Sequence, residues 1–380
     1  MSEIPRNIEA NIEKWLFKKK VITIFGARQV GKTTLAKRLL EKHGDPKHYY
    51  DGDILSVQEV FRSQDPEVCR RMFGSARLIV LDEAQQVPDI GMALKIIHDT
   101  LPEVQVIATG SSSFELGNRT GEPLTGRGLS FILYPFSLRE LEHRHTPIEV
   151  HAALPFHLRF GLYPEIVDKN KDDARVLLDD LVSKYLYKDV LAFEQLKKPD
   201  LLLRLLKLVA LQLGSEVSLN ELATTLGVGR ATVERYLDLL EKCFVIFRLK
   251  SFSRNLRTEL TRKEKIYFYD VGVRNGLISR FQPLDVRDDV GPLWENFCIV
   301  ERMKALAAHG MRRNFYFWRT HGQKELDLIE EYDGRLDAYE FKWKEGKIRT
   351  AVKREFTDAY PGSTITVVSS KSYHPFFAGE

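Results

Sequence analysis

Eight residues, Gly26 to Thr33, place glycine, lysine and threonine at the spacing G-x-x-x-x-G-K-T. This is the Walker A spacing, in which glycines allow backbone N–H groups to turn toward phosphate oxygens. We expect Lys32 to reach the β- and γ-phosphates and the Thr33 hydroxyl to ligate Mg²⁺. The loop therefore predicts a nucleoside triphosphate site. The residues expected to bind the nucleotide are Gly26, Ala27, Arg28, Gln29, Val30, Gly31, Lys32, Thr33 and Thr34.

The segments on either side of this loop predict the elements that position it. The apolar run 21–25 is typical of a buried strand, and residues 34–40 repeat apolar side chains near the helical spacing of 3.6. A helix that starts at the loop adds the positive end of its dipole to the phosphate site. A chance glycine-rich turn is the alternative, and the order strand, loop, helix argues against it.

A second apolar strand, 77–81, ends in the acidic pair Asp82 and Glu83, as in a Walker B motif. Ligands bind at the carboxyl edge of the strands in open α/β sheets, where this pair would lie. We expect Asp82 to hold Mg²⁺ through water and Glu83 to act as the general base that polarises the attacking water. The chain is thus predicted to be an enzyme, a P-loop ATPase.

Two further polar groups are candidates for the same reaction. A third strand, 104–108, leads into Thr109 and Ser111, either of which is placed to sense the γ-phosphate. A serine-rich turn that caps the next helix is an equal alternative. Arg127 lies on a loop before the strand 129–133 and is either an arginine finger, acting in its own or a neighbouring subunit, or a surface charge.

Adenine is the expected base. The segment Asn170–Asp173 matches the N-K-x-D pattern of guanine-specific proteins, but the residues after Asp82 do not form the D-x-x-G that a GTPase carries. The flanking sequence is also highly charged, so this segment predicts a solvated turn.

The middle of the chain predicts a helical linker over 149–199 and a winged helix-turn-helix over 200–255. A helix from Ser218, a turn at 227–229, a second helix over 230–242 and a strand at 244–249 form its signature. Such modules bind DNA or dock proteins. In the DNA-binding version Arg230, Thr232 and Arg235 would face the major groove of double-stranded DNA. The basic residues of the wing favour DNA: Lys250, Arg254, Arg257, Arg262, Lys263 and Lys265.

The last segment, 256–380, predicts a small α/β domain with a hairpin whose turn is Asp333-Gly334. Counting outward from this turn places Asp327 opposite Glu340 and Glu325 opposite Lys342. Facing carboxylates repel, and a second Mg²⁺ or Mn²⁺ would offset the repulsion. This D…E-x-K arrangement resembles the PD-(D/E)xK nuclease core, with Glu295 as a further ligand and Lys342 to orient water. A solvent-facing hairpin without metal is the alternative.

Composition limits the remaining possibilities. The chain has 380 residues, a net charge of +4 and three widely spaced cysteines, so neither a disulfide framework nor a zinc site is expected. The first 20 residues lack a signal-peptide core, and no run approaches the roughly 20 apolar residues of a membrane span. We therefore expect a cytoplasmic protein without a membrane partner. A homo-oligomer or an unidentified protein partner remains open.

Taken together, these motifs resemble the prokaryotic AAA-type ATPases whose C-terminal half is a domain of unknown function with a restriction-endonuclease-like core, relatives of the archaeal-type ATPases. The resemblance implies an α/β protein: an ATPase domain with a five-stranded parallel sheet over 1–148, followed by the linker, winged-helix and nuclease-like parts. The motifs that carry it, beyond the loop at 26–33, are 81–83, 110–112, 124–127, 134–137, 161–165, 269–272, 294–296, 325–327 and 340–342.

Overall fold

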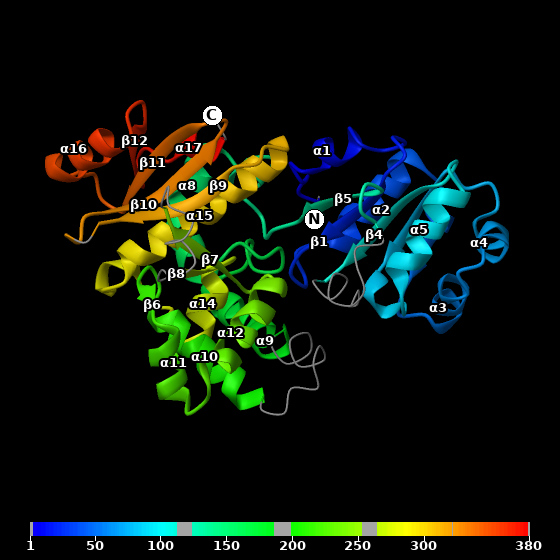
Figure 1. Cartoon of the computed structure of the whole chain (residues 1–380), viewed down its shortest axis with the longest axis horizontal. Helices are drawn as coiled ribbons and strands as arrows, with labels where there is room; N and C mark the ends of the chain where they lie inside the picture. Colours follow the sequence, from blue (N-terminus) through cyan, green and yellow to red (C-terminus); the bar gives the residue numbers. More distant parts are fainter. Residues whose placement is uncertain (1–2, 112–123, 186–198, 253–263, 321, 379–380) are drawn as a thin grey trace. The chain divides into compact units, whose positions relative to one another are not determined.

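A computed structural model of the chain describes residues 3–111, 124–185, 199–252, 264–320 and 322–378. These residues form two compact units (Figure 1). The first unit comprises Met1–Phe136 with Lys242–Phe244, and the second comprises Ser137–Glu241 with Val245–Glu380. Each unit has its own sheet, and each is described separately below.

The first unit is built on a five-stranded sheet with the order β2-β3-β4-β1-β5. Every neighbouring pair is parallel, which confirms the expected parallel sheet. Its elements are α1 (Glu9–Glu13), β1 (Val21–Phe25), α2 (Lys32–His43), η1 (Pro46–His48), β2 (Tyr49–Asp51), α3 (Leu55–Arg62), α4 (Pro66–Phe73), β3 (Leu78–Asp82), η2 (Ala84–Gln86), α5 (Ile90–Thr100), β4 (Gln105–Gly110) and β5 (Gly128–Ile132).

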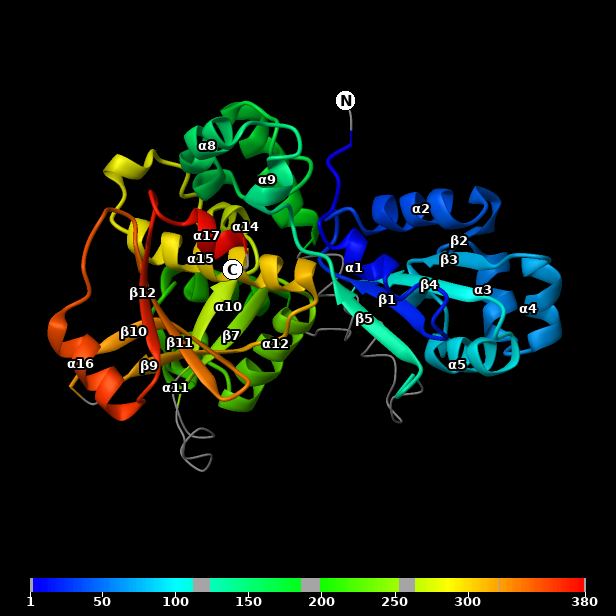
Figure 2. The same ribbon diagram turned by 90° about the horizontal axis from the view of Figure 1, so that it is seen from above.

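Helices cover both faces of this sheet, which is why its central strands are apolar throughout. Ile79 and Leu81 of β3 and Val106 of β4 lie in one core with the buried sides of α3, α4 and α5. Helix α2 packs on the other face against β3 and β4. Figure 2 shows α2 and α5 on opposite sides of the strands. This layering brings the carboxyl ends of β1, β3 and β4 to one edge.

The second unit contains a seven-stranded mixed sheet with the order β12-β11-β10-β9-β7-β8-β6. Its elements are α7 (Leu138–Leu141), α8 (Pro147–Phe160), α9 (Lys171–Tyr185), α10 (Pro199–Leu211), β6 (Glu216–Val217), α11 (Leu219–Leu226), α12 (Arg230–Lys242), β7 (Ile246–Ser251), β8 (Glu264–Phe268), α14 (Val271–Leu277), η4 (Leu284–Val286), α15 (Val290–His309), β9 (Asn314–Arg319), β10 (Glu325–Tyr332), β11 (Arg335–Lys342), α16 (Thr350–Ala359), β12 (Thr364–Ser369) and α17 (His374–Ala378).

This sheet runs across the boundary expected at 255/256. β7 pairs antiparallel with β8 and, on its other side, parallel with β9, where Lys250 lies beside Tyr316 and Ser251 beside Phe317. The strands β6, β7 and β8, which flank the helices α11 and α12 of the predicted winged helix, therefore share one sheet with the C-terminal hairpin. A pattern of local periodicity cannot show this pairing, because it joins segments about 65 residues apart.

Two of the segments that carry the family resemblance, 161–165 and 269–272, contact each other inside the second unit. The Asp270 carboxylate accepts hydrogen bonds from the backbone N–H groups of Leu162 (2.8 Å), Gly272 (2.8 Å) and Val273 (3.1 Å). A Cβ at Gly161 would lie 2.0 Å from an Asp270 oxygen. Only glycine fits there, and its φ of +79° also favours glycine.

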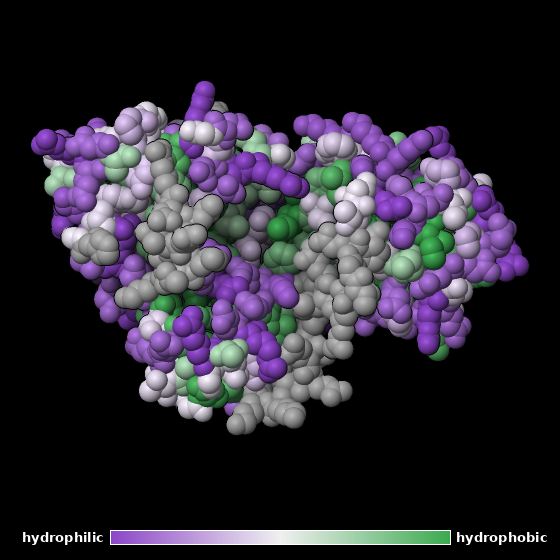
Figure 3. All heavy atoms as spheres, in the orientation of Figure 1, coloured by the Kyte–Doolittle hydropathy of each residue, from purple (hydrophilic) through white to green (hydrophobic). Residues whose placement is uncertain are grey.

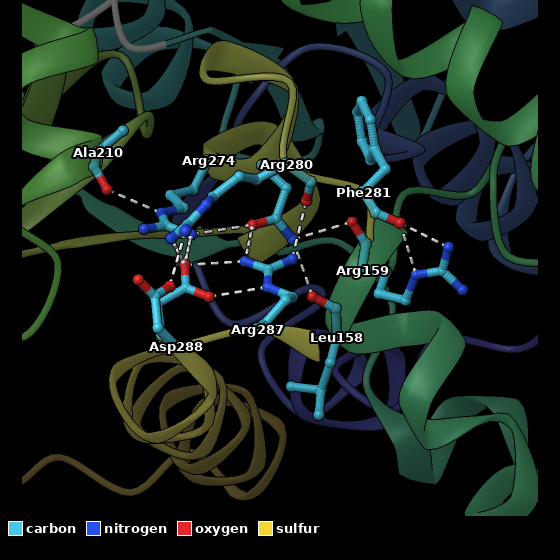
Figure 4. A network of polar contacts seen from close by, with 10 residues as sticks. Leu158, Arg159, Ala210, Arg274, Arg280, Phe281, Arg287 and Asp288 are labelled. Carbon is cyan, nitrogen blue, oxygen red and sulfur yellow. Dashed lines mark hydrogen bonds and ion pairs between the residues drawn. The ribbon is translucent and has the colours of Figure 1, made fainter. Parts of the chain in front are cut away.

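A buried polar network continues from this contact (Figure 4). The Asn275 amide donates to the carbonyl oxygens of Leu158 and Arg159, which end helix α8, and its oxygen accepts from Arg287 (3.0 Å). Arg287 and Arg274 both donate to the carboxylate of Asp289, next to the start of α15. Since Arg274 and Asn275 are almost fully buried, this network fixes α8, α14 and α15 relative to one another.

Among the described residues, no helix is long and apolar enough to cross a membrane. On the face shown in Figure 3, hydrophilic residues cover most of the described surface.

Candidate functional site

The phosphate loop lies between the end of β1 and the start of α2, as the sequence indicates. Gly26 has φ +152° and Gly31 has φ +98°, conformations that L side chains rarely adopt. A Cβ at Gly26 would also lie 2.2 Å from the Leu133 carbonyl oxygen. Both glycines are therefore required by the path of the loop, which ends at the N-terminus of α2.

Lys32 is the first residue of α2 and points back into the loop. Its side chain is buried, and Nζ donates to the carbonyl oxygens of Gly26 (3.1 Å) and Ala27 (2.9 Å). The ammonium group is thus held inside the curve of the loop that phosphate oxygens would occupy in a P-loop protein.

Asp82, at the carboxyl end of β3, is only 3% exposed and accepts hydrogen bonds from three hydroxyl groups. Thr33 donates to its Oδ2 at 2.7 Å, Tyr49 donates to the same oxygen at 2.6 Å, and Thr109 donates to Oδ1. The structure therefore brings Thr33 and Asp82 together. A hydroxyl and a carboxylate are the oxygen ligands that Mg²⁺ takes in nucleotide sites, so these two residues fit the ion.

Glu83 follows Asp82 in the left-handed region, with φ +46°. This backbone turn carries the Glu83 side chain away from the direction of β3. Its backbone N–H donates to Thr109 Oγ1 (3.2 Å), and its carboxylate accepts a hydrogen bond from the Gln85 amide. The other polar atom of that amide, Gln85 Oε1, is buried and has no partner among the described residues.

Of the two γ-phosphate sensor candidates, Thr109 contacts the acidic pair directly. It is 1% exposed, and its hydroxyl lies between the Asp82 carboxylate and the Glu83 backbone. Ser111 is also buried. Because Gly110 pairs with Phe25 in the sheet, Ser111 follows β4 beside the point where the phosphate loop begins.

Arg127 lies at the opposite edge of the sheet from the phosphate loop. It directly precedes β5, and its carbonyl oxygen accepts from Val21 N, at the first residue of β1. Its guanidinium pairs with Asp99 (2.8 Å), and this pairing lowers the pKa of the Asp99 carboxyl to about 2. The structure therefore does not bring Arg127 to the nucleotide site of its own chain.

Two residues at this site were not among the sequence-based candidates. Tyr49 contacts Asp82, and burial together with the Asp82 carboxylate raises the pKa of its phenol, so Tyr49 remains a donor. Arg6 donates to the carbonyl oxygens of Val30 (2.7 Å) and Tyr134 (2.5 Å) and ties the loop to the segment after β5. Tyr49 pairs with Val80 in the parallel register of β2 and β3, so it lies diagonal to Asp82 on the same face of the sheet. No signal in the sequence points to Arg6.

In the second unit, α12 presents two of the three predicted groove-facing residues to solvent. Arg230 and Arg235 are exposed and Thr232 is half-buried.

The basic residues of the predicted wing do not all face solvent. Lys250 is exposed, but Lys265 is 1% exposed and faces the interior, so its assignment to a basic wing surface was wrong. Arg254, Arg257, Arg262 and Lys263 lie outside the described residues.

The C-terminal hairpin has the predicted turn and register. Tyr332 pairs with Arg335, and the ladder continues to Leu328 and Tyr339. Beyond that pair, Asp327 accepts a hydrogen bond from Phe341 N (2.8 Å) through its carboxylate. Burial and the nearby charges of Glu295 and Glu340 raise the pKa of Asp327 well above its usual value.

The other members of this acidic cluster are paired with basic side chains. Lys265 on β8 contacts Glu295 (3.0 Å) and Glu325, and Lys342 contacts Glu340 at 2.5 Å. Glu325, which the sequence places opposite Lys342, forms an ion pair with Lys265. In the part of the chain that the structure describes, no three or more His, Cys, Asp or Glu side chains are arranged to hold a metal ion.

Family models match most of the chain in three pieces. Residues 18–142 match an AAA domain, residues 151–284 a domain of unknown function (DUF8612), and residues 290–376 another domain of unknown function (DUF4143). Residues 18–142 contain both the phosphate loop and the acidic pair. The first unit has the fold of a P-loop ATPase.

The relatives that match over much of their length have no assigned activity. An uncharacterized protein of Mycobacterium tuberculosis is 29% identical over 340 residues, which span 89% of this chain and 73% of that protein. An uncharacterized protein of Methanocaldococcus jannaschii is 24% identical over 300 residues, 68% of this chain and 63% of the relative.

Solved structures match with low scores. Cdc6p from Pyrobaculum aerophilum has a TM-score of 0.28 and 15% identity, over 74% of this chain and 97% of that one. AMPPCP-bound DnaA from Aquifex aeolicus has a TM-score of 0.26 and 16% identity, over 62% of this chain and 86% of that one.

Proposed function

We propose that the first unit binds ATP with Mg²⁺ at residues 26–34 and hydrolyses it. The observation that carries this proposal is the shared contact of Thr33 with Asp82, at 2.7 Å, beside a loop that holds the buried ammonium group of Lys32. Lys32 and Thr33 come from the start of α2 and Asp82 from the end of β3. They lie at the carboxyl edge of the sheet, where P-loop proteins bind nucleotides.

In the proposed reaction, the loop N–H groups and Lys32 bind the β- and γ-phosphates and stabilise the negative charge that develops on them. Thr33 and Asp82 hold Mg²⁺, which neutralises phosphate charge when bound. Glu83 orients and polarises water for in-line attack, after its carboxylate is released from the Gln85 amide. Thr109 fixes the backbone of Glu83 and senses the end of the phosphate chain, with Ser111 beside the loop as its neighbour.

The first prediction concerns nucleotide binding. Lys32→Ala removes the charge that faces the phosphates, and we expect it to weaken Mg·ATP binding at least tenfold in calorimetric titration. The matched control is Lys42→Ala, because Lys42 lies on the same helix, is 53% exposed and pairs with Glu13. Equal ATP affinity in the wild-type chain and both variants would contradict the proposal.

A second candidate function is the coupling of this ATPase to double-stranded DNA through α12. The observation that favours it is the exposure of Arg230 and Arg235 on a helix that follows the exposed, glycine-containing turn at 227–229. The alternative is a nucleotide-gated switch in which the same helices dock a protein. ATP turnover distinguishes the two: stimulation by DNA that is lost in Arg230→Ala/Arg235→Ala supports coupling, and turnover indifferent to DNA favours docking.

A further inference from the structure

The ammonium group of Lys265 lies where three elements of the second unit meet. Lys265 is on β8 and is 1% exposed. Its Nζ is 3.0 Å from Glu295 Oε1 on α15 and contacts the Glu325 carboxylate at the start of β10. One buried cation is therefore shared by two carboxylates that the chain brings from distant segments.

The environment of this ammonium group is closed on its other sides. A lysine ammonium has three N–H donors, and carboxylates accept from it at two contacts. The ring of Phe317 faces it with its centroid 5.4 Å away, a cation–π distance. Glu295 Oε1 accepts a second hydrogen bond, from the Tyr267 hydroxyl. This oxygen thus has little lone-pair density left for another ligand.

The two remaining carboxylates of the cluster are also held by groups of the chain. Asp327 accepts from Phe341 N (2.8 Å), and Glu340 pairs with Lys342 (2.5 Å). A divalent ion on Asp327, Glu340 and Glu295 would share Glu295 with Lys265 and would lie close to a buried positive charge, so the two cations would repel. The side chains present do not fit a metal at this hairpin.

We infer that Lys265 is the internal cation of this cluster and compensates, in place of a divalent metal ion, the negative charge that the carboxylates bring together at this hairpin. The second unit then does not hydrolyse phosphodiesters through a metal ion at this hairpin. The inference concerns the second unit alone and is independent of the proposed ATP site.

The test is Mn²⁺ binding to the full chain without nucleotide, measured by calorimetry in an Asp82→Asn background that removes the carboxylate of the first unit. With Lys265 present, we expect no binding at millimolar Mn²⁺. Lys265→Met frees the carboxylates, and we expect this variant to bind one Mn²⁺ with a Kd at least tenfold below the millimolar concentration at which its parent shows no binding. Adding Asp327→Asn should abolish the gain.

Lys304→Met is the matched control, because Lys304 is also buried and its ammonium group contacts Glu301 at 2.7 Å on the same helix. We expect it to gain no Mn²⁺ binding. The inference is overturned if the chain with Lys265 intact binds Mn²⁺ and loses it on Asp327→Asn. It is also overturned if Lys265→Met folds, as judged by circular dichroism, and gains no Mn²⁺. If Lys265→Met does not fold, Mn²⁺ titration of the chain with Lys265 intact, with and without Asp327→Asn, still tests the inference.

Discussion

At the scale of single residues, the candidate ATP site is arranged around the buried carboxylate of Asp82. Three hydroxyl donors, from Thr33, Tyr49 and Thr109, hold its two oxygens. A buried carboxylate costs free energy unless such donors satisfy it, so these contacts fix the position of Asp82 before any ligand binds. Thr109 has an additional role, because its oxygen also accepts from the backbone of the proposed general base, Glu83.

Thr109→Val therefore tests this role at nearly constant side-chain volume. A hydrogen bond to a charged group contributes about 1.5–3 kcal/mol, so we expect kcat for ATP to fall roughly 10- to 100-fold. The KM should change little, because Thr109 lies outside the loop that binds the phosphates.

The matched control for this substitution is Thr23→Val. Thr23 is equally buried, in β1, but its hydroxyl donates to Ser130 Oγ (2.9 Å) on β5, away from the acidic pair. The Thr23→Val variant should be less stable than the wild type, but its kcat for ATP should not fall as it does in Thr109→Val. If the two valine variants have the same kcat, Thr109 has only a structural role.

At the scale of elements, helix α8 carries a buried histidine that makes the stability of the second unit depend on pH. His157 is 3% exposed, its Nδ1 has no partner among the described residues, and burial lowers its pKa to about 4. The unfolded chain has the ordinary histidine pKa of about 6.5. Between these two values the unfolded state binds more protons than the folded state, so stability is lost as the pH falls from 6.5 toward 4.

His157→Gln should remove this part of the pH dependence. From the two pKa values we expect His157 to cost about 2 kcal/mol of unfolding free energy between pH 7.5 and pH 5. Urea unfolding of the wild-type and variant chains at both pH values measures the difference. An identical loss of stability in both chains would show that His157 does not titrate on unfolding in this range.

Helices, strands and turns could be predicted from the sequence where residues close in the chain determine the backbone conformation. Asp333-Gly334 set the register of the β10–β11 hairpin, and the glycines at 26 and 31 set the turn between β1 and α2. The position of Lys265 was not predictable, because a charged residue at the start of a strand usually lies in solvent. Its burial depends on Glu295 and Glu325, which reach it from segments 30 and 60 residues away.

At the scale of the whole molecule, the two units differ in how far the sequence determines their architecture. In the first unit, short βα repeats lead directly to a parallel sheet, and the site follows at its carboxyl edge. In the second unit, the pairing of β7 with β9 joins the helix-turn-helix segment to the C-terminal hairpin in one sheet. The expected boundary at 255/256 could not anticipate this, since the pairing depends on tertiary contacts that have no local signature.

The most direct test of the proposed function is ATP turnover by the wild-type chain and by Glu83→Gln, with and without double-stranded DNA. We expect the variant to bind Mg·ATP like the wild type but to turn it over about 10²- to 10⁴-fold more slowly, because it lacks only the general base. Turnover by the wild type should rise with DNA. Equal turnover in the two chains would contradict the assignment of Glu83, and the absence of turnover from the wild type under all conditions would contradict the ATPase itself.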